Sequence, residues 1–337
     1  MEYLSNVHSN NLVRWAKDKD DVVVFSGDLT GSTEIAKFKT TFPDRFYSLG
    51  MAEQNMLSWA GGMAREGMVP FLHTFAVFLY RRAYDQLSMS IAYPNLSVKL
   101  FGFLPGVTTP GGVTHQAIED IAVVRSIPNM TVFEMGDATD VESVLDLAYN
   151  VDGPVYIRMI RGKIPRLFDT NRPTEFNKAR ILNEGDDVTV FSSGICTEEA
   201  IRAVQALKEK GIAIEHLHIT TLKPFNDPLV VQAIKKAKHG IITMENHSTI
   251  GGLGTCVAEI MAGRGINKRL SKIGIKDTYA HGASRTYLVK KYGLDAMALI
   301  EEVFNLLGKK NTIQPDELEK VETNVKEKIE TSQLEAL

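Results

Sequence analysis

The chain has 337 residues, 44% of them hydrophobic and 23% charged, and its formal net charge is -3 at pH 7. At about 150 residues per domain, this length predicts two domains with sizeable apolar cores. The charge balance gives no support to nucleic-acid binding, and the two distant cysteines, Cys196 and Cys256, exclude a disulfide framework and a zinc-type spacing.

The first twenty residues, MEYLSNVHSNNLVRWAKDKD, predict a helix that ends near Asp18. This segment has neither the basic start nor the apolar run of a signal peptide. No stretch of the sequence approaches the roughly 18 uninterrupted apolar residues of a membrane span. Together with the low cysteine content, these features predict a reduced, cytoplasmic setting.

Short β-branched runs then alternate with amphipathic segments. Strands are expected over 21–27, 45–50, 69–75, 96–103, 130–135 and 154–160, with helices over 53–67, 79–92, 115–127 and 140–150. Near-continuous apolar strands joined by helices predict an α/β fold with an open parallel sheet covered on both faces. Ligands bind such sheets outside the carboxyl ends of the strands.

Residues 166–185, rich in polar side chains, interrupt this alternation and are predicted to be a linker. A second α/β unit follows over 186–309, with strands over 186–194, 212–222 and 241–246 and helices over 197–211 and 226–240. Residues 310–337 form a charged C-terminal tail. The sequence therefore predicts two doubly wound domains, 1–165 and 186–309.

In the segment SLGMAEQNM, Glu53 follows a glycine-containing turn and begins the helix expected over 53–67. Taken alone, a Glu in the first helical turn is explained by the helix dipole, which contributes about 0.3–1 kcal/mol. The residues after it, MLSWAGGMA, are apolar with closely spaced small side chains. This composition indicates a buried helix and therefore a carboxyl group at the edge of a core.

The motif GMAEQNM, followed by TFAVFLYRRAYDQL, GGVTHQAIED and YIRMIRG, resembles the C-terminal half of the transketolase family of thiamine diphosphate enzymes. The likeness runs from about Leu12 to Leu307. Full-length members begin with a diphosphate-binding domain whose Gly-Asp-Gly motif and downstream Asn hold a metal, and this sequence lacks that pattern. The resemblance therefore implies the smaller, C-terminal subunit of a two-piece transketolase, with a pyrimidine-binding domain over 1–165 and the transketolase C-terminal domain over 186–309.

The resemblance also implies an activity and a partner. A transketolase moves a two-carbon ketol unit from a ketose to an aldose through thiamine diphosphate. The N-terminal subunit would hold the diphosphate and its Mg²⁺ or Ca²⁺, so this chain would carry no metal site and would be active only with that partner. Two copies of each subunit would form a heterotetramer that acts on small sugars and binds neither nucleic acid nor membrane.

For the cofactor site, Glu53 matches the family's acid that activates the aminopyrimidine ring. Phe75 and Phe78 would line the pyrimidine pocket, with Phe78 stacked on the ring, although an aromatic cluster is by itself more typical of a core. Asp28 falls on a position close to the cofactor across the subunit contact.

For the substrate, the resemblance implies that Ser32 helps to hold the terminal phosphate of the sugar and that Arg81 faces the substrate. His115 matches a histidine that contacts substrate hydroxyls and moves protons. Arg161 would anchor an oxyanion, for which a guanidinium is well suited. Arg82 is expected to be solvated.

Three positions depart from the family pattern. The Asp usual four residues before His115 is Gly111, and the His usual twelve residues before it is Phe103. Asn10 falls near a position where a phosphate-binding Arg is common. These losses favour a specialised anionic sugar, such as a branched-sugar phosphate or a sulfosugar.

Other interpretations remain open. A 2-oxo acid dehydrogenase beta subunit has the same two-domain plan, and deoxyxylulose phosphate synthase is a second relative, but VTHQ and the Arg81 segment favour sugar transfer. A non-catalytic scaffold subunit would retain only the fold. The glycine-rich segment ENHSTIGGLG lacks the spacing of a dinucleotide site.

Overall fold

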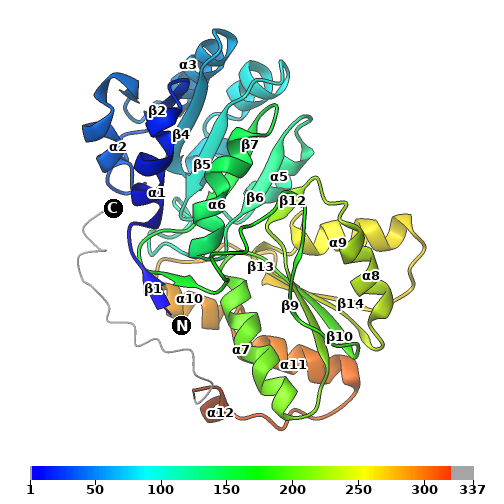
Figure 1. Ribbon diagram of the computed structural model, residues 1–337. Helices are drawn as coiled ribbons and strands as arrows, with labels where there is room; N and C mark the ends of the chain where they lie inside the picture. The colour runs from blue at the N-terminus through cyan, green and yellow to red at the C-terminus, as the bar shows by residue number, and fades with distance from the viewer. Residues whose placement is uncertain (1, 320–337) are drawn as a thin grey trace.

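The computed structural model describes residues 2–319, which form two α/β domains (Figure 1). The first contains a seven-stranded sheet in the order β12-β6-β7-β5-β4-β2-β3. Its strands are β2 (Val22–Ser26), β3 (Phe46–Ser48), β4 (Val69–Phe75), β5 (Lys99–Phe103), β6 (Thr131–Glu134), β7 (Val155–Met159) and β12 (Thr221–Lys223). All neighbouring pairs are parallel except β12 with β6.

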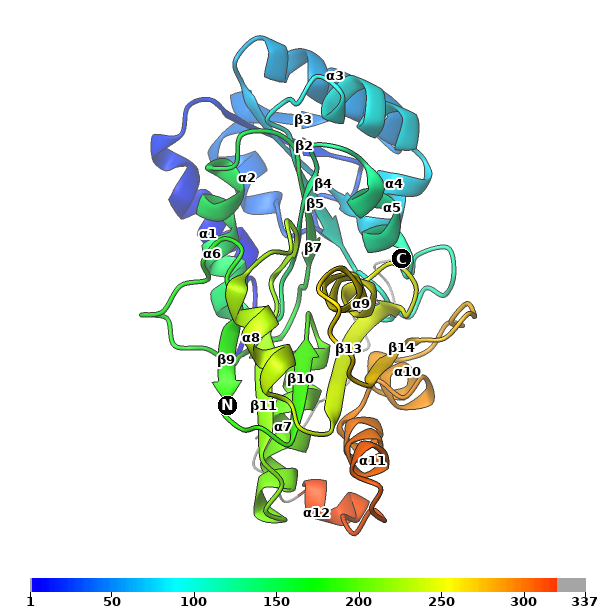
Figure 2. The same ribbon diagram turned by 90° about the vertical axis from the view of Figure 1, so that its right-hand side faces the viewer.

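Helices cover both faces of this sheet, as the apolar strands require. Figure 2 shows α1 (Val7–Trp15), α2 (Ala36–Thr41) and α6 (Ala138–Tyr149) on one side. On the other side lie α3 (Glu53–Arg65), α4 (Ala76–Arg81) and α5 (Asp120–Ser126). The doubly wound arrangement expected for residues 1–165 is therefore present.

The second domain has a five-stranded sheet in the order β14-β13-β10-β11-β9. Its strands are β9 (Arg180–Asn183), β10 (Val188–Ser192), β11 (Ile214–His218), β13 (Gly240–Ser248) and β14 (Leu270–Ile275). Its helices are α7 (Cys196–Glu209), α8 (Pro228–Lys236), α9 (Leu253–Gly263), α10 (Arg285–Lys291), α11 (Ala296–Leu307) and α12 (Pro315–Glu319). A small ribbon of β1 (Glu2–Leu4) and β8 (Ile164–Arg166) completes the strands of residues 2–319.

The structure corrects the expected boundaries in three places. β9 lies inside the predicted linker 166–185 and pairs antiparallel with β11, so the end of that segment belongs to the second sheet. The strand expected over 212–222 divides into β11 and β12, which join different sheets. In the predicted tail 310–337, Ile313 is buried and Lys210 Nζ lies 2.7 Å from Glu317 Oε2, so this part packs against α7. Residues 320–337 of that tail lie outside the described residues.

The helix expected over 79–92 is also divided. α4 ends at Arg81, and a π-helix, η3 (Gln86–Ala92), begins five residues later. η3 packs on α3, where a Cβ on Gly61 would lie 2.7 Å from the Ser90 carbonyl oxygen. The close approach of these two backbones explains the small residues of α3. Arg81 and Arg82 lie at the break between α4 and η3, and Arg82 pairs with Glu53.

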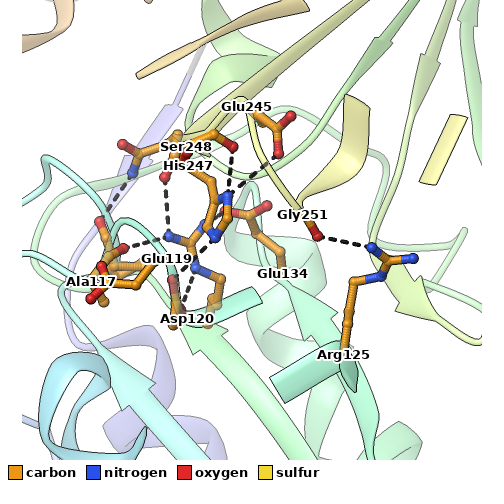
Figure 3. A network of polar contacts seen from close by, with 12 residues as sticks. Ala117, Glu119, Asp120, Arg125, Glu134, Glu245, His247, Ser248 and Gly251 are labelled. Atoms are coloured by element: carbon orange, nitrogen blue, oxygen red, sulfur yellow. Dashed lines mark hydrogen bonds and ion pairs between the residues drawn. The ribbon is translucent and has the colours of Figure 1, made fainter. Parts of the chain in front are cut away.

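A buried polar network joins the two domains (Figure 3). The fully buried Arg158 of β7 pairs with Asp120 and Glu134 of its own domain and donates to the Asn246 carbonyl of β13 at 3.0 Å. A buried guanidinium needs such partners, because an unpaired buried charge is strongly destabilising. None of the helices in residues 2–319 has the length and apolar run needed to cross a bilayer.

Candidate active site

Glu53 is the first residue of α3 and its side chain is only 2% exposed. Gly50, with φ of 71°, forms the left-handed turn that leads into the helix. Because Glu53 lies in the first turn of α3, its carboxyl group is near the positive end of the helix dipole. The residue before it, Ala52, provides no side-chain cap. The expected burial of this acid is therefore what the structure shows.

The partner of Glu53 is Arg82, which the sequence interpretation left in solvent. Arg82 Nη1 lies 3.1 Å from Glu53 Oε1 and 3.2 Å from Oε2. The guanidinium carbon is 3.9 Å from the centroid of the Phe78 ring, and 48% of the side chain is exposed. About half of the Arg82 side chain is therefore in solvent. Its guanidinium contacts Glu53, because a buried carboxylate requires a compensating hydrogen-bond donor.

Phe75, Phe78 and His115 form an aromatic cluster around this ion pair. Phe75 ends β4, Phe78 lies on α4, and His115 lies on the loop that follows β5. The ring centroids are 5.8 Å apart for Phe75 and Phe78, 5.9 Å for Phe75 and His115, and 5.6 Å for Phe78 and His115. The structure therefore brings four sequence-predicted residues, Glu53 among them, to one place.

His115 has an environment that favours its neutral form. Burial lowers the pKa of its imidazole, and the nearby charge of Arg82 lowers it further. Nδ1 lies 2.9 Å from Thr114 Oγ1. A neutral imidazole with one nitrogen held in this way can exchange a proton with a hydroxyl group.

Gly111, one of the departures from the family pattern, lies against His115. A Cβ on Gly111 would stand 3.0 Å from both Cβ and Cγ of His115. A larger side chain at position 111, such as Asp, would therefore require the His115 side chain to shift by a few tenths of an ångström.

Arg81 lies beside the cluster with its guanidinium bound to the His115 loop. Its Nε and Nη2 donate to Glu119 Oε1 and Oε2 at 2.8 Å and 2.9 Å. Nη1 donates to the Val113 carbonyl at 3.1 Å and Nη2 to the Gln116 carbonyl at 3.4 Å. This arrangement fastens α4 to the loop, and a contact of Arg81 with substrate stays a prediction.

Asp28, Ser32 and Arg161 lie at the carboxyl ends of β2 and β7. Asp28 is exposed with φ of 64°, and Ser32 is part of the turn that follows it. Burial lowers the pKa of Arg161, and the charge of Glu34 opposes that shift. Glu34 Oε1 also accepts from Gly162 N at 2.9 Å. Within residues 2–319, no hydrogen bond or ion pair joins these three residues directly to Glu53, so their shared role stays a prediction.

The other two departures occupy structural positions. Phe103 is fully buried at the end of β5, with its ring 5.6 Å from that of His8. His8 Nε2 lies 3.0 Å from His73 Nε2, and burial lowers the pKa of His8 to about 3. Asn10 Oδ1 accepts from Lys37 Nζ at 2.6 Å. The pair of buried histidines was missed by the sequence interpretation, which had no signal linking residues so far apart.

The Glu53 site fits an aminopyrimidine ring. The planar Arg82 group stacks on Phe78 and donates to a buried carboxylate, which is the set of contacts that a flat, nitrogen-bearing ring would make. Within residues 2–319, no group of three or more His, Cys, Asp or Glu side chains is placed to hold a metal ion.

Comparison with known proteins gives matches over most of the chain. The family described as transketolase, pyrimidine binding domain, matches residues 4–166, and transketolase, C-terminal domain, matches residues 177–299. The 6-deoxy-6-sulfo-D-fructose transketolase subunit SqwH of Clostridium sp. (strain MSTE9) is 35% identical over 92% of this chain and 96% of its own. A protein of Actinobacillus succinogenes, named as one of the subunits of an apulose-4-phosphate transketolase, is 31% identical over 90% of this chain and 98% of its own. A solved structure described as a split gene transketolase, inactive beta4 tetramer, is 36% identical, with a TM-score of 0.83 over 91% of this chain and 98% of that one.

Proposed function

This chain belongs to the transketolase family as the C-terminal subunit of a split enzyme, and on that premise we propose that it transfers a two-carbon ketol unit from an anionic ketose to an aldose. The observation that carries the proposal is the buried Glu53 carboxylate, which Arg82 links to the ring of Phe78 beside His115. A buried acid, a flat apolar face and a neutral imidazole are the groups that this reaction needs from the subunit.

Thiamine diphosphate, when bound, supplies the carbanion chemistry that no side chain provides. Glu53 would hold a pyrimidine nitrogen by a charge-assisted hydrogen bond, which is strong where water is excluded. Phe78 would fix the plane of the ring and Phe75 would close the pocket behind it. His115, 5.6 Å from the Phe78 ring, would exchange a proton with a hydroxyl group of the substrate.

An N-terminal subunit would complete the site by holding the diphosphate and its Mg²⁺ or Ca²⁺. Large apolar side chains are exposed on α3, on η3, which packs against α3, and on the segments beside them. They are Met51, Trp59, Tyr84, Met89 and Tyr93. Exposed apolar residues that gather in this way mark protein interfaces. They support an assembly in which the partner covers the cofactor, as in a heterotetramer of two copies of each subunit.

The substrate we propose is an anionic sugar other than a simple pentose phosphate. Phe103 and Gly111 replace residues that commonly bind the phosphate and a hydroxyl, and Asn10 is engaged by Lys37. Ser32 and Arg161 remain to hold the anionic end. Two relatives named for unusual sugars, a sulfofructose and apulose 4-phosphate, support this choice.

Reconstitution with the N-terminal subunit tests the proposal. We expect turnover to require both subunits and thiamine diphosphate, and 6-deoxy-6-sulfofructose or a branched-sugar phosphate to be used at least tenfold more efficiently than xylulose 5-phosphate. Equal efficiency with all donors would reject the specialised substrate. A reconstituted complex that binds the cofactor but transfers no ketol unit from any donor would reject the activity.

A further inference from the structure

The two consecutive arginines that follow Phe78 are held very differently. Arg81 donates from two nitrogens to both oxygens of Glu119, at 2.8 Å and 2.9 Å, and to two backbone carbonyls. Arg82 reaches Glu53 through Nη1 alone, at 3.1 Å and 3.2 Å. Strong charge-assisted bonds are about 2.7–2.9 Å long and are often formed by two nitrogens. The ion pair of Arg82 with Glu53 is therefore weaker than the ion pair of Arg81 with Glu119.

The guanidinium of Arg82 occupies the position over Phe78 and beside Glu53 that we propose for the pyrimidine ring. Its guanidinium stacks 3.9 Å from the Phe78 centroid and donates into a carboxylate that is otherwise buried. A guanidinium is flat, delocalised and rich in N–H donors, and it stacks on aromatic faces. Phe78 cannot present the same face to both Arg82 and a pyrimidine.

We propose that Arg82 is a displaceable stand-in for the cofactor's pyrimidine, seated between Phe78 and Glu53 in the free subunit and leaving for solvent when the ring enters. The inference rests on the proposed function, because the displacing group is the pyrimidine of thiamine diphosphate. In the free subunit Arg82 satisfies a carboxylate that would otherwise be buried without a donor.

The half-exposed side chain makes this exchange feasible. Arginine can keep its aliphatic stem on the protein surface while its charged end moves into water. Arg82 follows the last residue of α4, so its movement requires no change in the helix. Because Arg82 occupies the pyrimidine position in most molecules, the apparent affinity for the ring equals the intrinsic affinity multiplied by the fraction of molecules in which this position is open. The subunit alone should then bind the cofactor weakly, and the partner's contacts should drive Arg82 out.

Binding of the pyrimidine alone to the full-length subunit tests the inference. The probe is 4-amino-5-hydroxymethyl-2-methylpyrimidine, measured by calorimetry and by the fluorescence of Trp59 on α3. For an open fraction of about one-tenth, Arg82→Ala should bind about tenfold more tightly than the unmodified chain. Ethylguanidinium should compete with the probe in Arg82→Ala and have much less effect in the unmodified chain, whose seat is already filled.

Two further variants keep the result interpretable. Arg82→Lys preserves a charge for Glu53 and has no flat face for Phe78, so its affinity should lie between those of the other two. Lys39→Ala removes a cation that lies 5.7 Å from the Phe46 ring and should leave binding unchanged. Equal or weaker binding by Arg82→Ala, with circular dichroism unchanged, would overturn the inference and leave the proposed function standing. Absence of binding by every variant, and by the reconstituted complex, would overturn both.

Discussion

His218 at the end of β11 lies 2.8 Å from Asp140 in α6, through Nε2 and Oδ2, and both side chains are fully buried. The pair joins the two domains, since β11 belongs to the second sheet and α6 covers the first. Its imidazole Nδ1 also lies 2.7 Å from Thr197 Oγ1 on α7. This chain of contacts links the two domains through buried polar side chains.

Replacement of His218 by Ala should therefore destabilise the protein. The change removes one of the hydrogen-bond partners of the buried Asp140 carboxylate, which keeps Gly136 N and Thr174 Oγ1, and should cost about 1–3 kcal/mol. The free energy of unfolding, measured with urea on the isolated subunit, checks this value. His239→Ala, at an exposed position before β13, is the matched control and should change stability by less than about 0.5 kcal/mol. A loss below about 1 kcal/mol in His218→Ala would show that the pair does not fasten the domains.

Glu53→Gln should lower turnover of the reconstituted enzyme by at least about 100-fold, because positioned acid–base groups contribute about 10²–10⁴-fold. The amide fills the same volume, so the fold should be retained. Glu66→Gln, at the exposed C-terminal cap of α3, is the control and should turn over normally. Steady-state kinetics with saturating cofactor provides the measurement, and an unchanged rate in Glu53→Gln would favour a scaffold subunit.

Arg81 should act by positioning the His115 loop. Arg81→Ala removes the double contact with Glu119 and should lower kcat/KM about tenfold. Arg81→Lys should recover part of the loss. Because the two residues act as a unit, Glu119→Gln and the double variant Arg81→Ala/Glu119→Gln should show similar, non-additive losses. Fully additive effects would indicate instead that Arg81 touches the substrate by itself.

The pH dependence of His115 should change when Arg82 is removed. Burial and then the Arg82 charge lower the pKa of His115 in the unmodified chain, so its neutral form persists below the ordinary value near 6.5. In Arg82→Ala the lowering by burial remains, as does the hydrogen bond with the Gly111 backbone that raises the pKa, so the pKa should move upward. A nuclear magnetic resonance titration of the His115 ring protons measures the shift. An unchanged or lower pKa in Arg82→Ala would contradict the prediction.

Gly111→Asp restores the residue usual in the family but should not improve activity. The new Cβ would meet His115 at 3.0 Å, so the imidazole must move. Gly111→Ala isolates this steric effect and should show most of the same loss in kcat. A gain in kcat/KM for pentose phosphates in Gly111→Asp alone would show that the loop relaxes without cost.

The buried strands and the long helices could be predicted because their patterns are local. Runs such as VVVF and FLHTF fall at β2 and β4, and the apolar helix after Glu53 is α3. β9 and β12 could not be predicted as separate strands, since each is defined by a partner far away in the sequence.

The same division applies to the active site. The motif resemblance located Glu53, Phe75, Phe78 and His115, which the fold then brought together. It did not locate Arg82, because an arginine beside another arginine carries no sign of which one turns inward. Only the spacing of four residues between Phe78 and Arg82, one helical turn, could have suggested a stacked pair.

The crossing of β12 into the first sheet has a practical consequence for dissecting this protein. β12 covers β6, the strand that would otherwise end the sheet on that side. A fragment that ends at residue 165 would expose the unpaired main-chain amides and carbonyls of β6. Such an exposed edge strand pairs with strands of other molecules. Expression of the N-terminal half alone should therefore give aggregates. A fragment carried through Lys223 would keep β12 on β6 but would expose the edge of β10, which pairs with β13 in the whole chain.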